Sequence, residues 1–274
     1  MGDYTQEIGK KAYNCIMDEI SYERAHLEDL AAQCTNRNYL TASSFFGFSE
    51  LSSLNLPKDY FSGAPYFLYG GHPNAERNIV VFYPDYLDEL SILEEEKKEA
   101  TLISCLLLEP KSQKFGEELS HRDVLGSLMA LGIKRETLGD ILLDGKKAVI
   151  YCLNNIAEEI LNGLHEIRHT SIKVKKIAIG ESPIESKYIE MALRVTSIRL
   201  DSILAAAFKI SREKAKEHIV AGNVTVTGLA VPQSDSSLSI GAHVSLKGKG
   251  KFIYKGQEGT SKKGKDIVVI DMAD

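Results

Sequence analysis

The chain has 274 residues, of which 43% are hydrophobic and 26% charged, and this length is sufficient for two or three domains with hydrophobic cores. It contains no run of about 18 apolar residues and begins with the polar segment MGDYTQEIGKK, so we expect neither a membrane span nor a signal peptide. Four cysteines without CxxC spacing, at positions 15, 34, 105 and 152, indicate reduced and mostly buried thiols. We therefore expect a cytoplasmic protein.

The net charge of −5 is unevenly distributed along the chain. From Arg194 onward there are 13 Lys and Arg against 8 Asp and Glu, a net charge of +5. The preceding residues include 20 Lys and Arg against 30 Asp and Glu, a net charge of −10. An acidic body with a basic C-terminal module indicates localised contact with RNA rather than nonspecific coating of nucleic acid.

The N-terminal third predicts a small α+β region, residues 1–94. Residues 4–34 predict two helices with separate apolar stripes, the first Ile8, Ala12, Cys15 and Ile16, and the second Leu27, Leu30 and Ala31. Two strands are expected at Pro65–Gly70 and Asn78–Tyr83. The charged run Glu94–Glu99 is interpreted as a solvated boundary.

A second unit, residues 98–180, predicts the element order β-α-β-β-α-β. The expected elements are Ala100–Leu108, Arg122–Leu131 with Ser120 and Asp123 as a capping box, Ile141–Leu143, Ala148–Cys152, Asn154–Glu166 and Ser171–Ile179. This order is the ferredoxin-like plan that RNA-recognition motifs share. Tyr151 is the only aromatic residue of the third strand, whereas those motifs stack bases on an aromatic pair. We interpret the unit as a scaffold or protein-docking surface. Contact with RNA through Arg122, Lys134 and Arg135 is the alternative.

After a linker predicted at residues 181–193, the stretch from Arg199 to Gly228 predicts two short helices and a strand. Leu200, Ile203, Leu204, Ala207 and Phe208 form the apolar stripe of the first helix. Ser211 is the expected N-cap of the second helix, Gly222 ends it, and Asn223–Thr227 alternates as a strand. Further strands are expected at Ala242–Leu246, Lys251–Tyr254 and Asp266–Asp271.

The cations of this module are predicted to share one surface. Arg212 and Lys216 are four residues apart on the face opposite Ala215 and Ile219, and Lys209 and Arg199 lie nearby. Guanidinium and ammonium groups on a rigid helix suit phosphate oxygens. The alternative is an ordinary solvated helix face.

The pattern R-L-D followed by S-R-x-x-A-x-x-x-I-x-x-G-x-V-x-V resembles the S4 RNA-binding domain. In that family the second helix and the loop before the strand bind structured RNA. With the Lys- and Gly-rich segment KGKGKFIYKGQEGTSKKGK, the resemblance implies an RNA surface made of Arg199, Asp201, Lys209, Ser211, Arg212, Lys214, Lys216, Asn223, Thr225, Lys247, Lys249 and Lys251. Thr227 departs from the family, which usually has Asn before the turn glycine, and puts the turn type in question.

Two short patterns resemble catalytic motifs. His165–His169 matches H-E-x-x-H of zinc peptidases, although Arg168 separates the would-be ligands and no third ligand follows. Arg199-Leu200-Asp201 resembles the aspartate loop of pseudouridine synthases without its continuation. No glycine-rich nucleotide loop is present. We therefore expect a protein without catalytic residues, metal or cofactor; an RNA-modifying enzyme or zinc-dependent hydrolase is the alternative.

The segment HRDVLGSLMALGIKRETLGD, residues 121–140, together with the C-terminal module resembles the YlmH family of bacterial S4-domain proteins. The resemblance covers roughly residues 100–274. It implies a monomeric, non-enzymatic factor that binds large-subunit rRNA, with tRNA as a second candidate ligand. Family members act on ribosomes that carry stalled peptidyl-tRNA and are encoded near division genes. A division-linked scaffold with incidental RNA binding is a third hypothesis.

Overall fold

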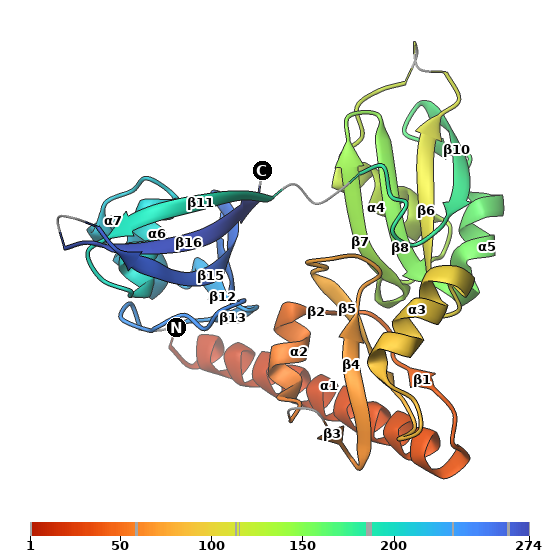
Figure 1. Cartoon of the computed structure of the whole chain (residues 1–274), viewed down its shortest axis with the longest axis horizontal. Coiled ribbons are helices and arrows are strands. Elements are labelled where there is room, and N and C mark those ends of the chain that lie inside the picture. The colour runs from red at the N-terminus through yellow and green to blue at the C-terminus, as the bar shows by residue number, and fades with distance from the viewer. Residues whose placement is uncertain are drawn as a thin grey trace. The chain divides into compact units, whose positions relative to one another are not determined.

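A computed structural model describes residues 2–57, 60–112, 114, 116–184, 188–231, 233–261 and 264–273, with side chains from residue 18 onward except those of residues 19, 229 and 230. The first helix stripe predicted above, including Cys15, lies outside the described side chains. The chain divides into two compact units, Met1–Glu185 and Ser186–Asp274 (Figure 1). Helices and mostly antiparallel strands both occur along the described chain, with runs of strands such as β12 to β16, which confirms the α+β class. None of the described helices is both long and apolar enough to cross a membrane.

The N-terminal region begins with one helix, α1 (Gly2–Arg37), so the prediction of two helices was wrong. Between the two predicted stripes there is no Gly or Pro to end a helix. Leu27 and Ala31 are fully buried against a small sheet, as the second stripe predicted. The two predicted strands, β4 (Ala64–Tyr69) and β5 (Arg77–Phe82), pair antiparallel. Short elements complete the region: β1 (Thr41–Ala42), β2 (Phe46–Gly47), α2 (Phe48–Leu54) and β3 (Tyr60–Phe61).

The charged run at 94–99 is not a solvated boundary, because it belongs to helix α3 (Glu89–Glu99) and includes a buried carboxylate. The Glu96 side chain accepts hydrogen bonds from the backbone amides of Thr101, Leu102 and Ile103, at 2.8–3.0 Å, and from the Thr101 hydroxyl. Glu96 is 2% exposed. A buried carboxylate is tolerated when donors surround it. Glu96 therefore ties α3 to the first strand of the central sheet.

The central part has the predicted β-α-β-β-α-β order. Its elements are β6 (Ile103–Pro110), α4 (His121–Ala130), η1 (Arg135–Thr137), β7 (Leu138–Asp144), β8 (Lys147–Leu153), α5 (Asn154–Gly163), β9 (Glu166–Ile167) and β10 (Thr170–Ile177). The sheet runs β7-β8-β6-β10-β9 with antiparallel neighbours, which confirms the ferredoxin-like plan. Ser120 and Asp123 form the predicted capping box at the start of α4.

The two faces of this sheet are covered differently. One face packs against α4 and α5, with Leu106, Leu108 and Ile150 among the buried residues. The other face packs against the N-terminal region, so that Tyr151 shares a core with Phe45 and Ile79 of that region. The N-terminal and central parts therefore belong to one unit with a common core, whereas the sequence predicted separate domains at 1–94 and 98–180.

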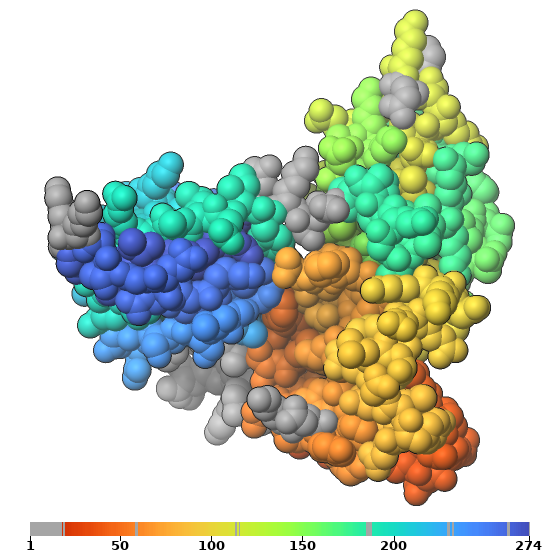
Figure 2. All heavy atoms as spheres, in the orientation of Figure 1, coloured from red at the N-terminus to blue at the C-terminus, as the bar shows by residue number. Residues whose placement is uncertain are grey.

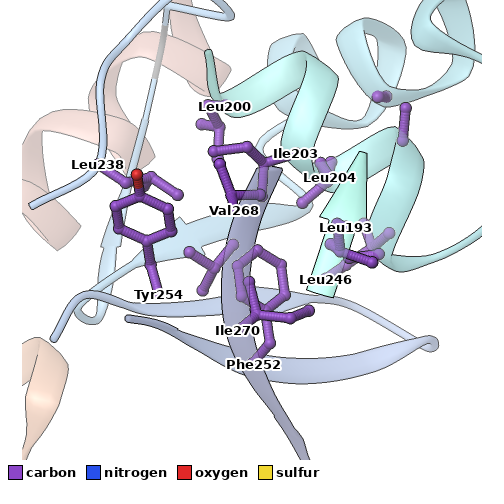
Figure 3. Packing of buried hydrophobic residues seen from close by; sticks show 14 of the residues in the cluster. Leu193, Leu200, Ile203, Leu204, Leu238, Leu246, Phe252, Tyr254, Val268 and Ile270 are labelled. Carbon is purple, nitrogen blue, oxygen red and sulfur yellow. The ribbon is translucent and has the colours of Figure 1, made fainter. Parts of the chain in front are cut away.

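The described residues of the second unit form two helices on a six-stranded sheet. Its elements are β11 (Tyr188–Val195), α6 (Leu200–Ala207), α7 (Arg212–Val220), β12 (Val224–Val226), β13 (Leu229–Ala230), β14 (His243–Leu246), β15 (Gly250–Thr260) and β16 (Asp266–Ala273). The strand order is β11-β16-β15-β14-β12-β13. Figure 3 shows Leu200, Ile203 and Leu204 of α6 packed against residues of the sheet such as Phe252 and Val268. The apolar stripe predicted for the first helix is therefore confirmed as the face of α6 that packs against the sheet.

The predicted linker, residues 181–193, includes most of a strand. From Tyr188 onward the chain forms β11, which pairs with β16 along its whole length from Tyr188↔Ala273 to Val195↔Asp266. Strand β11 is an edge strand whose burial pattern lacks clean alternation, so its sequence gave a weak strand signal. A separate C-terminal domain at 194–274 remains a prediction, and the second unit observed starts at Ser186.

The cysteines with described side chains agree with the expectation of reduced, buried thiols. Cys34, Cys105 and Cys152 are free and buried. Burial raises the pKa of Cys105 to about 11 and that of Cys152 to about 12. These thiols are therefore protonated and unreactive at neutral pH.

Candidate nucleic-acid interface

The helices that carry the predicted RNA contacts are held at both ends by local hydrogen bonds. The first turn of α6 is capped by a loop, since the Leu200 and Asp201 amides donate to the Ser236 and Ser234 carbonyls at 3.0 and 3.1 Å. Ser211 is the N-cap of α7, as predicted, and its hydroxyl accepts from the Lys214 amide at 3.2 Å. Ser211 is therefore occupied as a cap, although its residue surface is exposed.

Asp201 is the centre of a cluster of cations, here called the Asp201 cluster: Asp201, Arg199, Arg212 and Lys216. The Arg212 guanidinium donates to both carboxylate oxygens, at 2.9 and 3.1 Å. The Arg199 Nε and Lys216 Nζ atoms lie 3.5 and 3.9 Å from the carboxylate. The Asp201 side chain has no exposed surface, whereas the three cations are 42–51% exposed. The cluster presents positive groups to solvent around a hidden negative charge.

This geometry corrects two predictions. Asp201 cannot contact RNA from its buried position; it positions the cations instead. Arg212 and Lys216 do not lie opposite Ala215 and Ile219 but flank them, because residues four apart advance by about 40° around a helix. A flanking position lets Arg212 reach from α7 into the α6 interface while part of its side chain remains in solvent.

Lys214 is separated from the Asp201 cluster. It lies about 160° around α7 from Lys216, with the exposed Glu213 and Glu217 between them. The structure therefore does not bring Lys214 together with Arg212 and Lys216. If Lys214 binds RNA, as predicted, it contacts a different part of the RNA from Arg212 and Lys216.

Lys209 lies in a conformation that is unusual for its residue type. Its φ is +52°, the left-handed region that glycine favours, directly after helix α6. The Ile210 amide donates to the Ala205 carbonyl at 3.0 Å, the long hydrogen bond of a Schellman motif. The position suits glycine sterically, yet an exposed lysine occupies it. A lysine at this position therefore carries backbone strain that glycine would avoid.

The remaining predicted residues lie near the loop between β14 and β15. The Lys247 amide donates to the Asn223 carbonyl at 2.9 Å, so the two predicted residues are adjacent. Lys247 and Lys249 are exposed in this loop, while Lys251 is partly buried in β15. A Cβ at Gly250 would lie 3.7 Å from the Phe208 ring, which places the loop beside the end of α6 and hence near Lys209. Thr225 is paired on both sides, with Ala230 and Ser245.

The turn at Thr227 keeps its glycine-type geometry despite the threonine. Thr227 and Gly228 both have positive φ, +48° and +82°, as in the type I′ turn of a two-residue hairpin. Strands β12 and β13 pair across it, from Val226 to Leu229. The departure from the S4 pattern therefore changes the strain at one residue and leaves the hairpin in place.

Among the described residues of the central part, Tyr151 does not form an aromatic stacking face. Tyr151 is 1% exposed and stacks on His72 of the N-terminal region, with ring centroids 4.6 Å apart. Arg135 donates to the Leu138 and Gly139 carbonyls, at 3.0 and 3.3 Å, and so has a structural role. Among the suggested contacts Arg122 and Lys134 are exposed.

The His165–His169 pattern is not arranged as in zinc peptidases. His165–His169 spans the hairpin between β9 and β10 rather than a helix, with Arg168 at the turn, φ +54°. The two imidazoles therefore lack the shared helical face that H-E-x-x-H requires. Within the described part of the chain, no group of three or more His, Cys, Asp or Glu residues is placed to hold a metal.

Comparisons with known proteins give a family resemblance for this chain. Residues 105–181 match the family described as the putative RNA-binding domain in YlmH. The ribosome-associated protein quality control protein P2 of Bacillus subtilis (strain 168) is 26% identical over 197 residues, which make up 72% of this chain and 73% of the relative. The solved structure of the cell division protein ylmH from Streptococcus pneumoniae is 22% identical, covers 61% of this chain and 94% of its own, and has a TM-score of 0.45. The resemblance to the YlmH family is therefore confirmed.

Proposed function

We propose that this protein binds ribosomal RNA through the Asp201 cluster and the neighbouring lysines of an S4-like C-terminal module. The observation that carries the proposal is the fixed position of Arg212. A buried carboxylate holds its guanidinium while 44% of the side chain faces solvent. Preorganised cations lose little side-chain entropy when they bind phosphate. Exposed Lys209, Lys216, Lys247 and Lys249 extend this surface.

The finer assignment follows the family. We infer that the RNA belongs to the large ribosomal subunit, that tRNA on stalled ribosomes is a second ligand, and that the protein supports quality control of incomplete chains in the cytoplasm as a monomer. The name of the Bacillus subtilis relative, a ribosome-associated quality control protein, supports this assignment. Binding rather than catalysis is proposed because the aspartate of the synthase-like Arg199-Leu200-Asp201 pattern is buried and occupied by Arg212.

The experiment that tests the proposal is crosslinking of the protein to RNA in cells, followed by sequencing of the attached fragments. Large-subunit rRNA fragments attached to peptides of α6, α7 or the β14–β15 loop are the expected result. Mass spectrometry of the crosslinked peptides identifies the protein side of each contact. Fragments drawn evenly from mRNA and rRNA, or peptides from other surfaces alone, would contradict the proposal.

A further inference from the structure

One face of the central sheet is covered along only part of its length. On β6, Cys105 and Leu107 point toward the N-terminal region and belong to the core shared with it. Side chains alternate along a strand, so Glu109 lies on the same face, two residues farther along. Figure 1 shows the N-terminal region against one end of the central sheet, while β6 and β10 continue past it toward the loop after residue 110. In Figure 2 the yellow and green atoms of the central part likewise extend beyond the orange N-terminal region.

The uncovered part of this face carries lysines from two strands around one glutamate. Lys147 of β8 and Lys175 of β10 donate to the Glu109 carboxylate, at 2.8 and 2.7 Å. Lys173 of β10 is directly opposite Glu109 in the strand register and is exposed. We call Lys147, Lys173, Lys175 and Glu109 the lysine face. The side chains of Lys147 and Lys175 are 39% and 45% exposed, so both reach solvent while they are paired with Glu109.

The charges of this surface do not balance. Glu109 pairs with Lys147 and Lys175, and the two ion pairs hold the pKa of Glu109 at about 2, so it is ionised at neutral pH, while Lys173 adds a third positive charge. Asp144, exposed at the start of the β7–β8 turn, adds one negative charge, and exposed Lys111 after β6 adds one positive charge. The surface therefore has a net charge of about +2, in a unit that belongs to the acidic part of the chain.

We propose that the lysine face is a second RNA-binding site, which contacts the phosphate backbone of structured RNA without reading its bases. Lys147 lies on β8 and the other two lysines lie on β10, and because both strands flank β6 their backbones are roughly 10 Å apart. Flexible ammonium groups on such a flat surface can follow successive phosphates. Tyr151, the aromatic residue of β8, is buried and unable to stack on a base. All three lysines lie within the matched RNA-binding domain, residues 105–181.

The site rests on the proposed function, because it adds a contact to the same RNA ligand. The test measures binding of the full chain to purified bacterial ribosomes over a range of salt concentrations. Lys173→Gln with Lys175→Gln should lower the slope of log affinity against log salt by about two and weaken binding about tenfold. Lys97→Gln with Lys98→Gln, which removes two exposed charges from α3 of the same unit, is the matched control and should change neither.

A second variant separates an RNA surface from a merely structural ion pair. Glu109→Gln removes the negative charge among the lysines and should strengthen ribosome binding several-fold, although it weakens the folded state. Unchanged binding and slope in both the lysine variant and Glu109→Gln would overturn the second site. Failure of the unaltered protein to bind ribosomes would instead contradict the proposed function itself.

Discussion

The Arg212 guanidinium holds both oxygens of the Asp201 carboxylate, at 2.9 and 3.1 Å, and Asp201 has no exposed surface. The pair connects the first turn of α6 to the first turn of α7. It therefore fixes the angle at which α7 presents its cations. Substitutions of Arg212 alter both stability and charge, and this must be separated from any effect on RNA binding.

The Asp201–Arg212 pair predicts an asymmetric effect on stability. Arg212→Gln leaves the buried carboxylate without its main partner and should reduce the free energy of unfolding by about 3 kcal/mol. Asp201→Asn leaves an arginine that water can solvate, and should cost about 1–2 kcal/mol. The double variant should cost less than the sum of the two. Urea unfolding of all four proteins gives this cycle, and strictly additive effects would show that the pair does not couple the helices.

Lys209 predicts opposite effects on stability and binding. Lys209→Gly relieves the left-handed strain at φ +52° and should stabilise the fold by about 1 kcal/mol while weakening ribosome binding. Lys209→Ala removes the same charge without relieving the strain, so it should weaken binding equally and leave the melting temperature nearly unchanged. Thermal unfolding measures the change in stability, and co-sedimentation with ribosomes measures the change in binding. If Lys209→Gly binds as well as the unaltered protein, the lysine is not a contact.

The sequence was sufficient to predict the elements with strong local signals. The capping box at Ser120, the apolar stripe of α6 and the Ser211 cap depend on residues a few positions apart, and each was confirmed. The position of Arg212 was predicted less well, since its contact with Asp201 depends on how two helices pack. A carboxylate followed by an arginine eleven residues later is a weak signal without that packing.

Long-range contacts explain what the sequence did not predict. Glu96 lies in a run of charged residues, and its sequence does not distinguish it from its exposed neighbours. It is buried because the backbone amides of residues 101–103 donate hydrogen bonds to its carboxylate. The lysines at 147 and 175 converge because β8 and β10 flank β6, which requires knowledge of the strand order. Strand β11 was predicted as part of a linker because an edge strand carries little periodic pattern.

The buried carboxylate of Glu96 predicts a localised loss of stability. Glu96→Gln has one acceptor oxygen in place of two and adds donors that face the amides of Thr101 and Leu102. The free energy of unfolding of the first unit should fall by about 2–3 kcal/mol. Hydrogen exchange should speed up first at residues 101–103. Exposed Glu94→Gln, on the same helix, is the control and should have little effect.

Glu109 predicts a specific pH dependence. Its folded-state pKa of about 2 is below the ordinary value of 4.5 because Lys147 and Lys175 donate to it. The stabilising contribution is therefore complete above about pH 4.5 and is lost as the pH falls through about 2. Carboxyl chemical shifts in NMR measure the titration directly. In a Lys147→Gln, Lys175→Gln variant the pKa should move back toward 4.5, and a titration that stays near 2 would show that another group holds it down.

The central claim is that exposed cations of the C-terminal module bind ribosomal RNA. Lys216→Gln with Lys247→Gln tests it most directly, because both side chains are exposed and Arg212 keeps Asp201 neutralised. The measurement is the salt dependence of binding to purified ribosomes, with Lys97→Gln and Lys98→Gln as the control. The slope should fall by about two and binding should weaken at least tenfold, while the control matches the unaltered protein. Equal slopes and affinities in all three proteins would contradict the account.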